Sequence, residues 1–177
     1  MKSTLIFLLL IPICVLSQKY TIDNSTVTFY SYAPIEDIKA ESASLQGVVD
    51  FSSKEFFFRI PINSFVFPSS LMQQHFNESY LESHLFPLSV FKGTFDNNAD
   101  SPKKSQTITT QGIFLIHGIE KNISINTDLV IKQDEIVFSS QFLVRLKDFD
   151  IKVPKTFVDN IAEVIEVNVK GTLVPLD

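Results

Sequence analysis

Apolar and polar side chains alternate along most of the chain. In the segment from Glu55 to Ile62, for example, every second residue is Phe or Ile. A period of two is typical of a β-strand that buries one face and exposes the other. The same alternation predicts eight strands, at residues 20–32, 45–51, 55–62, 88–96, 107–118, 122–132, 136–146 and 163–174.

Short polar connections join several of these strands. Residues 52–54 separate the second strand from the third, and residues 119–121 and 133–135 separate the fifth, sixth and seventh. Connections this short predict antiparallel hairpins, so residues 107–146 are expected to form a meander. The longest polar loop is predicted at residues 97–106. The fold class is therefore all-β, with a sheet that closes or stacks.

One segment before residue 88 has a helical period instead. Ser70 followed by Gln73 is a capping-box pattern that predicts a helix start, and Pro87 is expected to end the helix. Its apolar stripe falls at positions i, i+4 and i+8, namely Met72, Phe76 and Tyr80. A shorter helical turn is predicted at residues 156–161.

The first seventeen residues have the pattern of a signal peptide. Lys2 precedes an apolar run from Leu5 to Leu16, and the small residue Ser17 follows it. A membrane anchor is the alternative, but a bilayer span needs about 20 apolar residues. We therefore expect cleavage before Gln18 and export to the periplasm or the extracellular space. Residues 18–177, which number 177 − 17 = 160, then form one domain.

Charge and cysteine content narrow the classes of partner and chemistry. Removing Lys2 with the signal peptide changes the formal net charge from −5 to −6, which disfavours nucleic acid and anionic membrane surfaces as partners. Cys14 lies inside the signal peptide, so the exported chain has no thiol for disulfides, catalysis or metal binding. Glycine-rich phosphate loops are absent from the sequence, which gives no support for a nucleotide cofactor.

Phenylalanine is unusually abundant, with seventeen residues against four Tyr and no Trp. An eight-stranded barrel encloses a narrow interior that is either filled by side chains or holds one small ligand. The sequence leaves both interpretations open. The inward positions predicted to form an apolar, ligand-binding interior are Phe51, Phe56, Phe58, Phe91, Phe95, Phe114, Phe138 and Phe142.

The polar candidates fit no catalytic or metal pattern. His75, Glu78, Glu82 and His84 match no zinc spacing, so a solvated helix face is favoured, with His75 as a contact at the barrel rim. His117 is predicted to be a polar rim residue at a strand end. A hydrolase that uses His75 or His117 would also need a nucleophile and an orienting acid, and neither occurs in a recognisable motif. The chain is predicted not to be an enzyme and to hold no metal.

Arg145 is the first candidate for a cationic contact. It precedes Asp148 and Asp150 in the segment RLKDFDIKVP. We favour an ion pair with these aspartates that helps to close the barrel, and the alternative is recognition of a ligand head group.

Three segments together resemble the YceI-like family. They are LMQQHFNESYLESHLFPLSVFKGTF (residues 71–95), GIFLIHGIEKNISI (112–125) and RLKDFDIKVP (145–154). The first is similar to a shorter subgroup with the pattern M-x-x-H-F-N-x-x-Y-x-E-S. The resemblance implies an eight-stranded, lipocalin-like antiparallel barrel with a helix near one end. It also implies binding of long polyisoprenoid chains such as quinone tails, and a bacterial envelope location.

These observations predict an exported, non-catalytic protein that holds a long apolar lipid inside a barrel. Burying one methylene group contributes about 0.8 kcal/mol, so a long chain can be retained without specific polar contacts. The alternative is a packed structural or interaction barrel of the cell envelope that has no lipid ligand.

Overall fold

The computed structural model describes residues 19–32, 37–96, 105–132, 135–153 and 161–176. All eight predicted strands are present, and one further strand lies between the first and second of them. The nine strands are β1 (Lys19–Ser31), β2 (Ile38–Ser42), β3 (Gln46–Asp50), β4 (Glu55–Pro61), β5 (Leu88–Phe95), β6 (Ser105–Ile116), β7 (Ile119–Lys132), β8 (Glu135–Arg145) and β9 (Val164–Pro175).

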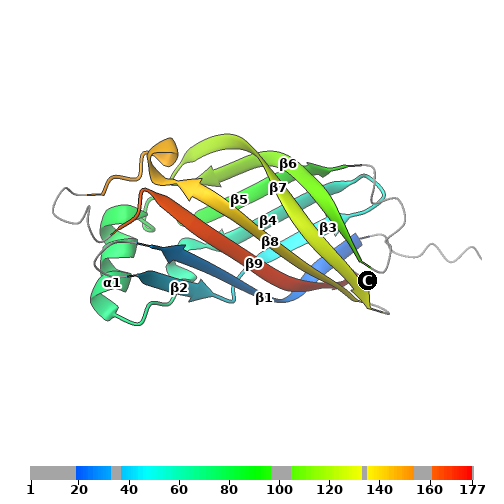
Figure 1. The fold of residues 1–177 in the computed structure, drawn as a ribbon, viewed down its shortest axis with the longest axis horizontal. Helices are drawn as coiled ribbons and strands as arrows, with labels where there is room; N and C mark the ends of the chain where they lie inside the picture. The colour runs from blue at the N-terminus through cyan, green and yellow to red at the C-terminus, as the bar shows by residue number, and fades with distance from the viewer. Residues whose placement is uncertain (1–18, 33–36, 97–104, 133–134, 154–160, 177) are drawn as a thin grey trace, which may run out of the picture.

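The strands form a closed antiparallel barrel with eight strand positions (Figure 1). From β3 to β9 each strand pairs with the next, and β1 pairs with β9 to close the sheet. The long strand β1 pairs on its other edge with β3 at its start, as Tyr20 with Val49, and with β2 at its end, as Val27 with Ser42. Two short strands therefore share one position in the barrel.

The sequence did not predict β2 because this strand is short and has only two apolar positions, Ile38 and Ala40. Its buried residues are Ala40 and Ser42, and the Ser42 hydroxyl lies 2.6 Å from the hydroxyl of Ser64. The edge of β2 is held further by backbone hydrogen bonds between Glu41 and Val66. These polar contacts add to the packing of Ile38 and Ala40 against the hydrophobic core.

Two predicted connections differ in the structure. The turn between β6 and β7 is His117–Gly118, with φ values of 52° and 73°, so the predicted turn residues 119–121 belong to β7. Because β6 begins at Ser105, the last two residues of the predicted loop 97–106 are strand residues. The rest of that loop, Gln133, Asp134, most of the predicted turn 156–161 and the predicted signal peptide lie outside the described residues.

The predicted helix is present, with its start displaced by one residue. Helix α1 (Ser70–His75) is capped by Ser69, whose hydroxyl accepts from the Met72 N–H at 3.4 Å, and not by Ser70. The helix continues as a π-helical turn, η2 (Phe76–Tyr80), in which the Leu81 N–H donates to the Phe76 carbonyl at 2.9 Å. The helix therefore ends before Pro87 is reached.

Short helical turns accompany α1 at the same end of the barrel (Figure 1). They are η1 (Ile62–Ser64), which follows β4, and η4 (Leu146–Phe149), which follows β8. Within the described ranges, none of the helices is long and apolar enough to cross a membrane.

Candidate functional site

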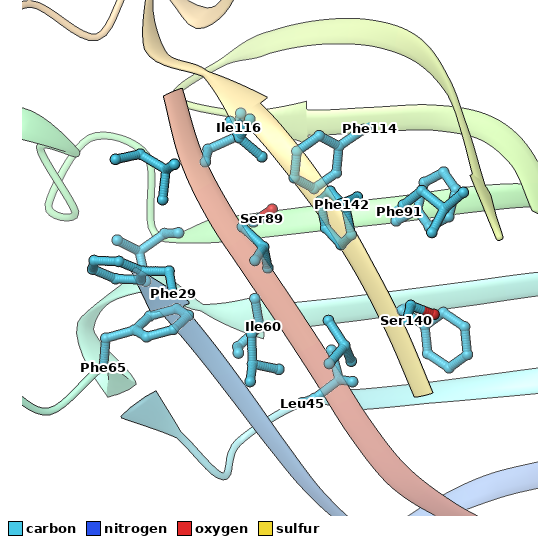
Figure 2. Close-up of a pocket in the computed structure, with 18 of the residues that line it drawn as sticks. Phe29, Leu45, Ile60, Phe65, Ser89, Phe91, Phe114, Ile116, Ser140 and Phe142 are labelled. Carbon is cyan, nitrogen blue, oxygen red and sulfur yellow. The ribbon is translucent and has the colours of Figure 1, made fainter. Parts of the chain in front are cut away.

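The barrel interior is hollow, with a cavity of about 430 Å³. Its lining is almost wholly apolar and comes from every strand position, from α1 and from η2. Figure 2 shows side chains such as Phe91, Phe114 and Phe142 pointing into this space. An apolar cavity of about 150 Å³ already stays dry and holds benzene, so the volume here suits a larger apolar guest.

All eight phenylalanines predicted to face inward line this cavity. Several form a continuous set of ring contacts along the barrel. Phe91 lies 4.7 Å from Phe56 and 6.2 Å from Phe114, and Phe114 lies 6.0 Å from Phe142, measured between ring centroids. The lining is therefore aromatic over most of its length.

Four lining phenylalanines were not predicted as cavity residues. Phe29, Phe65, Phe67 and Phe76 gather at the helix end, where the Phe76 ring lies 5.0 Å from Phe67 and 5.5 Å from Phe29. The alternation in β1 could have identified Phe29. Phe65 and Phe67 follow η1 in irregular chain, so no period in the sequence shows which way they point.

Glycines lie opposite two of the inward rings. Gly47 pairs with Phe58, and Gly171 pairs with Phe138. A Cβ atom on either glycine would lie within 3 Å of the partner's ring, so each ring occupies the space of the missing side chain. Phe58 and Phe138 also stack on each other at 6.0 Å with an interplanar angle of 22°. Because β4 and β8 lie on opposite sides of the closed sheet, this contact crosses the interior of the barrel.

Aromatic residues close the barrel at the end opposite the helix. The Phe51 ring makes edge contacts with Tyr20 and with Phe95, each at 5.4 Å. These residues belong to a hydrophobic cluster that includes Leu129 and Leu173. Aromatic and aliphatic side chains therefore pack together at this end of the interior.

The helix covers the other end with the predicted stripe. Phe76 is buried, and Met72 and Tyr80 pack against the same hydrophobic cluster. Burial raises the pKa of the Tyr80 hydroxyl above its ordinary value. Leu71 is 59% exposed and yet lines the cavity, as does the partly buried His75. The cavity thus approaches solvent beside α1.

The polar residues of the M-x-x-H-F-N-x-x-Y-x-E-S pattern close the end of the helix. The Asn77 side-chain amide donates to the Gln73 carbonyl at 2.9 Å, and its oxygen accepts from the Ser83 hydroxyl at 2.8 Å. The Ser83 N–H also donates to the Asn77 carbonyl. The pattern therefore encodes a helix end as well as the apolar stripe.

His117 lies outside the cavity lining and joins three segments. Its Nδ1 is 3.1 Å from the Phe149 carbonyl in η4, and its Nε2 is 2.9 Å from the Glu82 carboxylate. Phe86 packs against the imidazole at 4.6 Å. Both ring nitrogens therefore contact oxygen atoms of neighbouring segments. This arrangement is structural, and it uses Glu82, which the sequence had grouped with His75, Glu78 and His84.

Arg145 also lies outside the cavity lining. It is exposed at the end of β8, and the ion pair of Asp150 is made with Lys152 at 3.5 Å, not with Arg145 as predicted. The reason is the left-handed conformation of Asp150 (φ 51°), which turns the chain after η4. Among the described residues, no group of three or more His, Cys, Asp and Glu side chains is placed to hold a metal ion.

Comparison with known proteins agrees with this architecture. The family model described as a YceI-like domain matches residues 20–173, which span nearly all of the described barrel. The chain belongs to the YceI-like family. The search of curated proteins gave no match for this YceI-like chain.

Solved structures related to this YceI-like protein have the same fold at low sequence identity. A polyisoprenoid binding domain from Saccharophagus degradans implicated in plant cell wall breakdown superposes with a TM-score of 0.77 at 13% identity, covering 89% of this chain and 98% of that one. BcnA from Burkholderia cenocepacia gives 0.70 at 12% identity, covering 84% and 95%. The YCEI protein of Campylobacter jejuni gives 0.64 at 17% identity, covering 82% and 90%.

Proposed function

We propose that this protein is an exported, non-catalytic binding protein that holds a long apolar lipid, a polyisoprenoid or quinone-type chain, inside the barrel. The observation that carries the proposal is the hollow interior lined by phenylalanine and aliphatic side chains. Side chains alone do not fill an apolar cavity of this size to the density that is normal for a protein interior. A bound apolar chain supplies the missing packing contacts.

The lining favours a hydrocarbon chain over a charged small molecule. Of the described lining residues, Arg59 and His75 are the ones that can carry positive charge. The Arg59 side chain donates to Gln46 and is exposed, and His75 lies in the helix at one end. The rest of the cavity therefore offers no ionic partner to a ligand. Each buried methylene group contributes about 0.8 kcal/mol, so affinity grows with chain length.

The resemblance of the fold to the polyisoprenoid binding domain from Saccharophagus degradans supports the same ligand class. We infer that the chain enters beside α1, because Leu71 and His75 connect the cavity lining with the surface there. At the end opposite the helix, the rings of Tyr20, Phe51 and Phe95 pack against one another.

Export is the second part of the proposal and rests on the pattern of residues 1–17. Intact-mass analysis of secreted or periplasmic material is expected to show a chain that begins at Gln18. A chain that retains Met1 and sediments with membranes would contradict it.

The ligand is tested first by lipid extraction and mass spectrometry of the purified exported protein, where an isoprenoid lipid is expected. Binding of a labelled polyprenol is then compared between the parent and Phe58→Asp, in which a carboxylate faces the cavity. We expect the labelled polyprenol to be lost from this variant, because an unpaired charge beside a buried hydrocarbon costs several kcal/mol.

Two controls accompany Phe58→Asp. Phe57→Asp places the same charge on the exposed side of β4, where Phe57 is 44% exposed, and is expected to bind normally. His75→Gln is also expected to retain the lipid. Circular dichroism restricts the comparison to folded variants. If the parent binds no polyprenol, or if folded Phe58→Asp binds it as well as the parent does, the packed interaction barrel replaces this proposal.

A further inference from the structure

Two hydroxyl groups lie side by side on the wall of the otherwise apolar cavity. Thr127 in β7 and Ser140 in β8 are register partners, and their hydroxyl oxygens are 2.9 Å apart. Both residues line the cavity, and Figure 2 shows Ser140 among the lining side chains. The pair lies near the middle of both strands, away from either end of the barrel.

The surroundings of this hydroxyl pair are apolar. Across the sheet the flanking register partners are Ile108 in β6 and Val169 in β9. Along β8 the neighbours on the same face are Phe138 and Phe142, which are both lining residues. A hydroxyl buried without a complete set of hydrogen bonds costs about 1–3 kcal/mol, so two of them at this position need a compensating interaction.

When the two hydroxyls bond to each other, one of their two hydrogens remains available to donate. Each hydroxyl has one hydrogen and two lone pairs. One hydroxyl donates to the other, and within the described chain the second hydrogen has no protein acceptor. Two other cavity hydroxyls are used differently, since Ser89 donates to the Leu115 carbonyl and Thr110 donates to the Ile125 carbonyl, each at 2.9 Å.

We propose that the Thr127–Ser140 hydroxyl pair donates a hydrogen bond to an uncharged carbonyl oxygen of the bound lipid, such as that of a ketone, quinone or ester. The inference rests on the proposed lipid-binding function and adds a polar anchor to it. A charged phosphate is disfavoured at this depth, because the described lining has no cation near the middle of the barrel. The pair therefore sets the depth at which the ligand's polar group rests.

The test compares two matched probes. One is a polyprenyl methyl ketone, and the other is the hydrocarbon in which a methylene group replaces the carbonyl. The parent is expected to bind the ketone about three- to tenfold more tightly, the range for one neutral hydrogen bond. In the double variant T127V/S140A both probes are expected to bind equally. Valine has nearly the shape of threonine, so the change removes hydroxyls with little change of volume.

The matched control is Ser89→Ala, which removes a cavity hydroxyl that already donates to the backbone. This variant is expected to keep the preference for the ketone. Infrared spectroscopy of a ¹³C-labelled ketone gives a second measurement that does not depend on a difference in affinity. The carbonyl band is expected at lower frequency in the parent than in T127V/S140A, because a hydrogen bond weakens the C=O stretch.

The outcomes separate this inference from the function on which it rests. If the hydrocarbon binds the parent as tightly as the ketone and the carbonyl band is unshifted, water or nothing occupies the free donor. Lipid binding then stands and the polar anchor is wrong. A ketone preference that survives in T127V/S140A also overturns the anchor. If neither probe binds the folded parent, both proposals fail together.

Discussion

Glu82 and His117 lie 2.9 Å apart, and their contact ties the chain that follows the helix to the turn between β6 and β7. Both residues have positive φ angles, 43° and 52°, so each sits at a sharp reversal of the chain. Through Nδ1 the same imidazole holds the Phe149 carbonyl of η4. The pair therefore organises the end of the barrel that the helix covers, without facing the cavity.

Removing this contact is expected to reduce stability and leave the cavity intact. Hydrogen bonds to charged groups contribute about 1.5–3 kcal/mol, and the 38% exposure of Glu82 lowers the expectation to about 1 kcal/mol for Glu82→Ala. Urea unfolding of Glu82→Ala, of His117→Asn and of the double variant would measure the coupling. Glu120→Ala, at an exposed position of β7, is the control. Additive losses would show that the two side chains do not interact.

The packing of the helix over one end of the barrel depends on Phe76. This ring contacts the rings of Phe29, Phe65 and Phe67 and is buried. Phe76→Ala is expected to lower the free energy of unfolding by about 3–5 kcal/mol, the range for deleting a buried aromatic ring. Chemical denaturation is the measurement. Phe57→Ala, on the outer face, is expected to cost less than about 1 kcal/mol. Similar losses for both variants would contradict the assigned packing.

The pairing of Gly171 with Phe138 is testable by compensation. A Cβ atom at residue 171 would lie 2.7 Å from the Phe138 ring and 2.8 Å from the Asn24 carbonyl oxygen. Gly171→Ala is therefore expected to cost about 1–3 kcal/mol through overpacking. The smaller side chain in G171A/F138L is expected to recover part of that loss, as a thermal denaturation cycle would show. A purely additive double variant would locate the strain at the Asn24 backbone instead.

The hairpin between β3 and β4 gives a pH-dependent prediction. The Ser52 hydroxyl and the Ser52 and Ser53 N–H groups donate to the Asp50 carboxylate, and these hydrogen bonds hold its pKa below 3.8. A carboxyl whose pKa is lower in the folded state stabilises the protein above its unfolded pKa and loses this effect as pH falls through the folded value.

The melting temperature of Asp50→Asn is therefore expected to lie below that of the parent at neutral pH. The difference is expected to shrink as the pH falls below about 3.8, towards the lowered pKa. Asp148→Asn, at an exposed position, is the control. A difference that stays constant down to the acid limit of folding would contradict the role of the Asp50 charge.

Much of the barrel follows from the sequence alone. A period of two requires one buried face, and the eight segments with this period became the main barrel strands, from β1 to β9 without β2. The inward phenylalanines were found for the same reason, because strand alternation assigns a face to every residue. The stripe of Met72, Phe76 and Tyr80 was found through the helical period. Each of these patterns is local, because the period by itself determines which side chains share a face.

Features that follow no period in the sequence were decided only by the tertiary structure. Strand β2 is too short for a clear period, Phe65 and Phe67 follow an irregular turn, and Glu82 meets His117 across 35 residues of sequence. The alternation also left open whether the interior is filled or hollow, because this depends on where rings from different strands meet, as Phe58 of β4 and Phe138 of β8 do across the barrel. Alternation tells which side chains point inward. The space left between them depends on how rings from distant strands pack, and no local pattern contains that information.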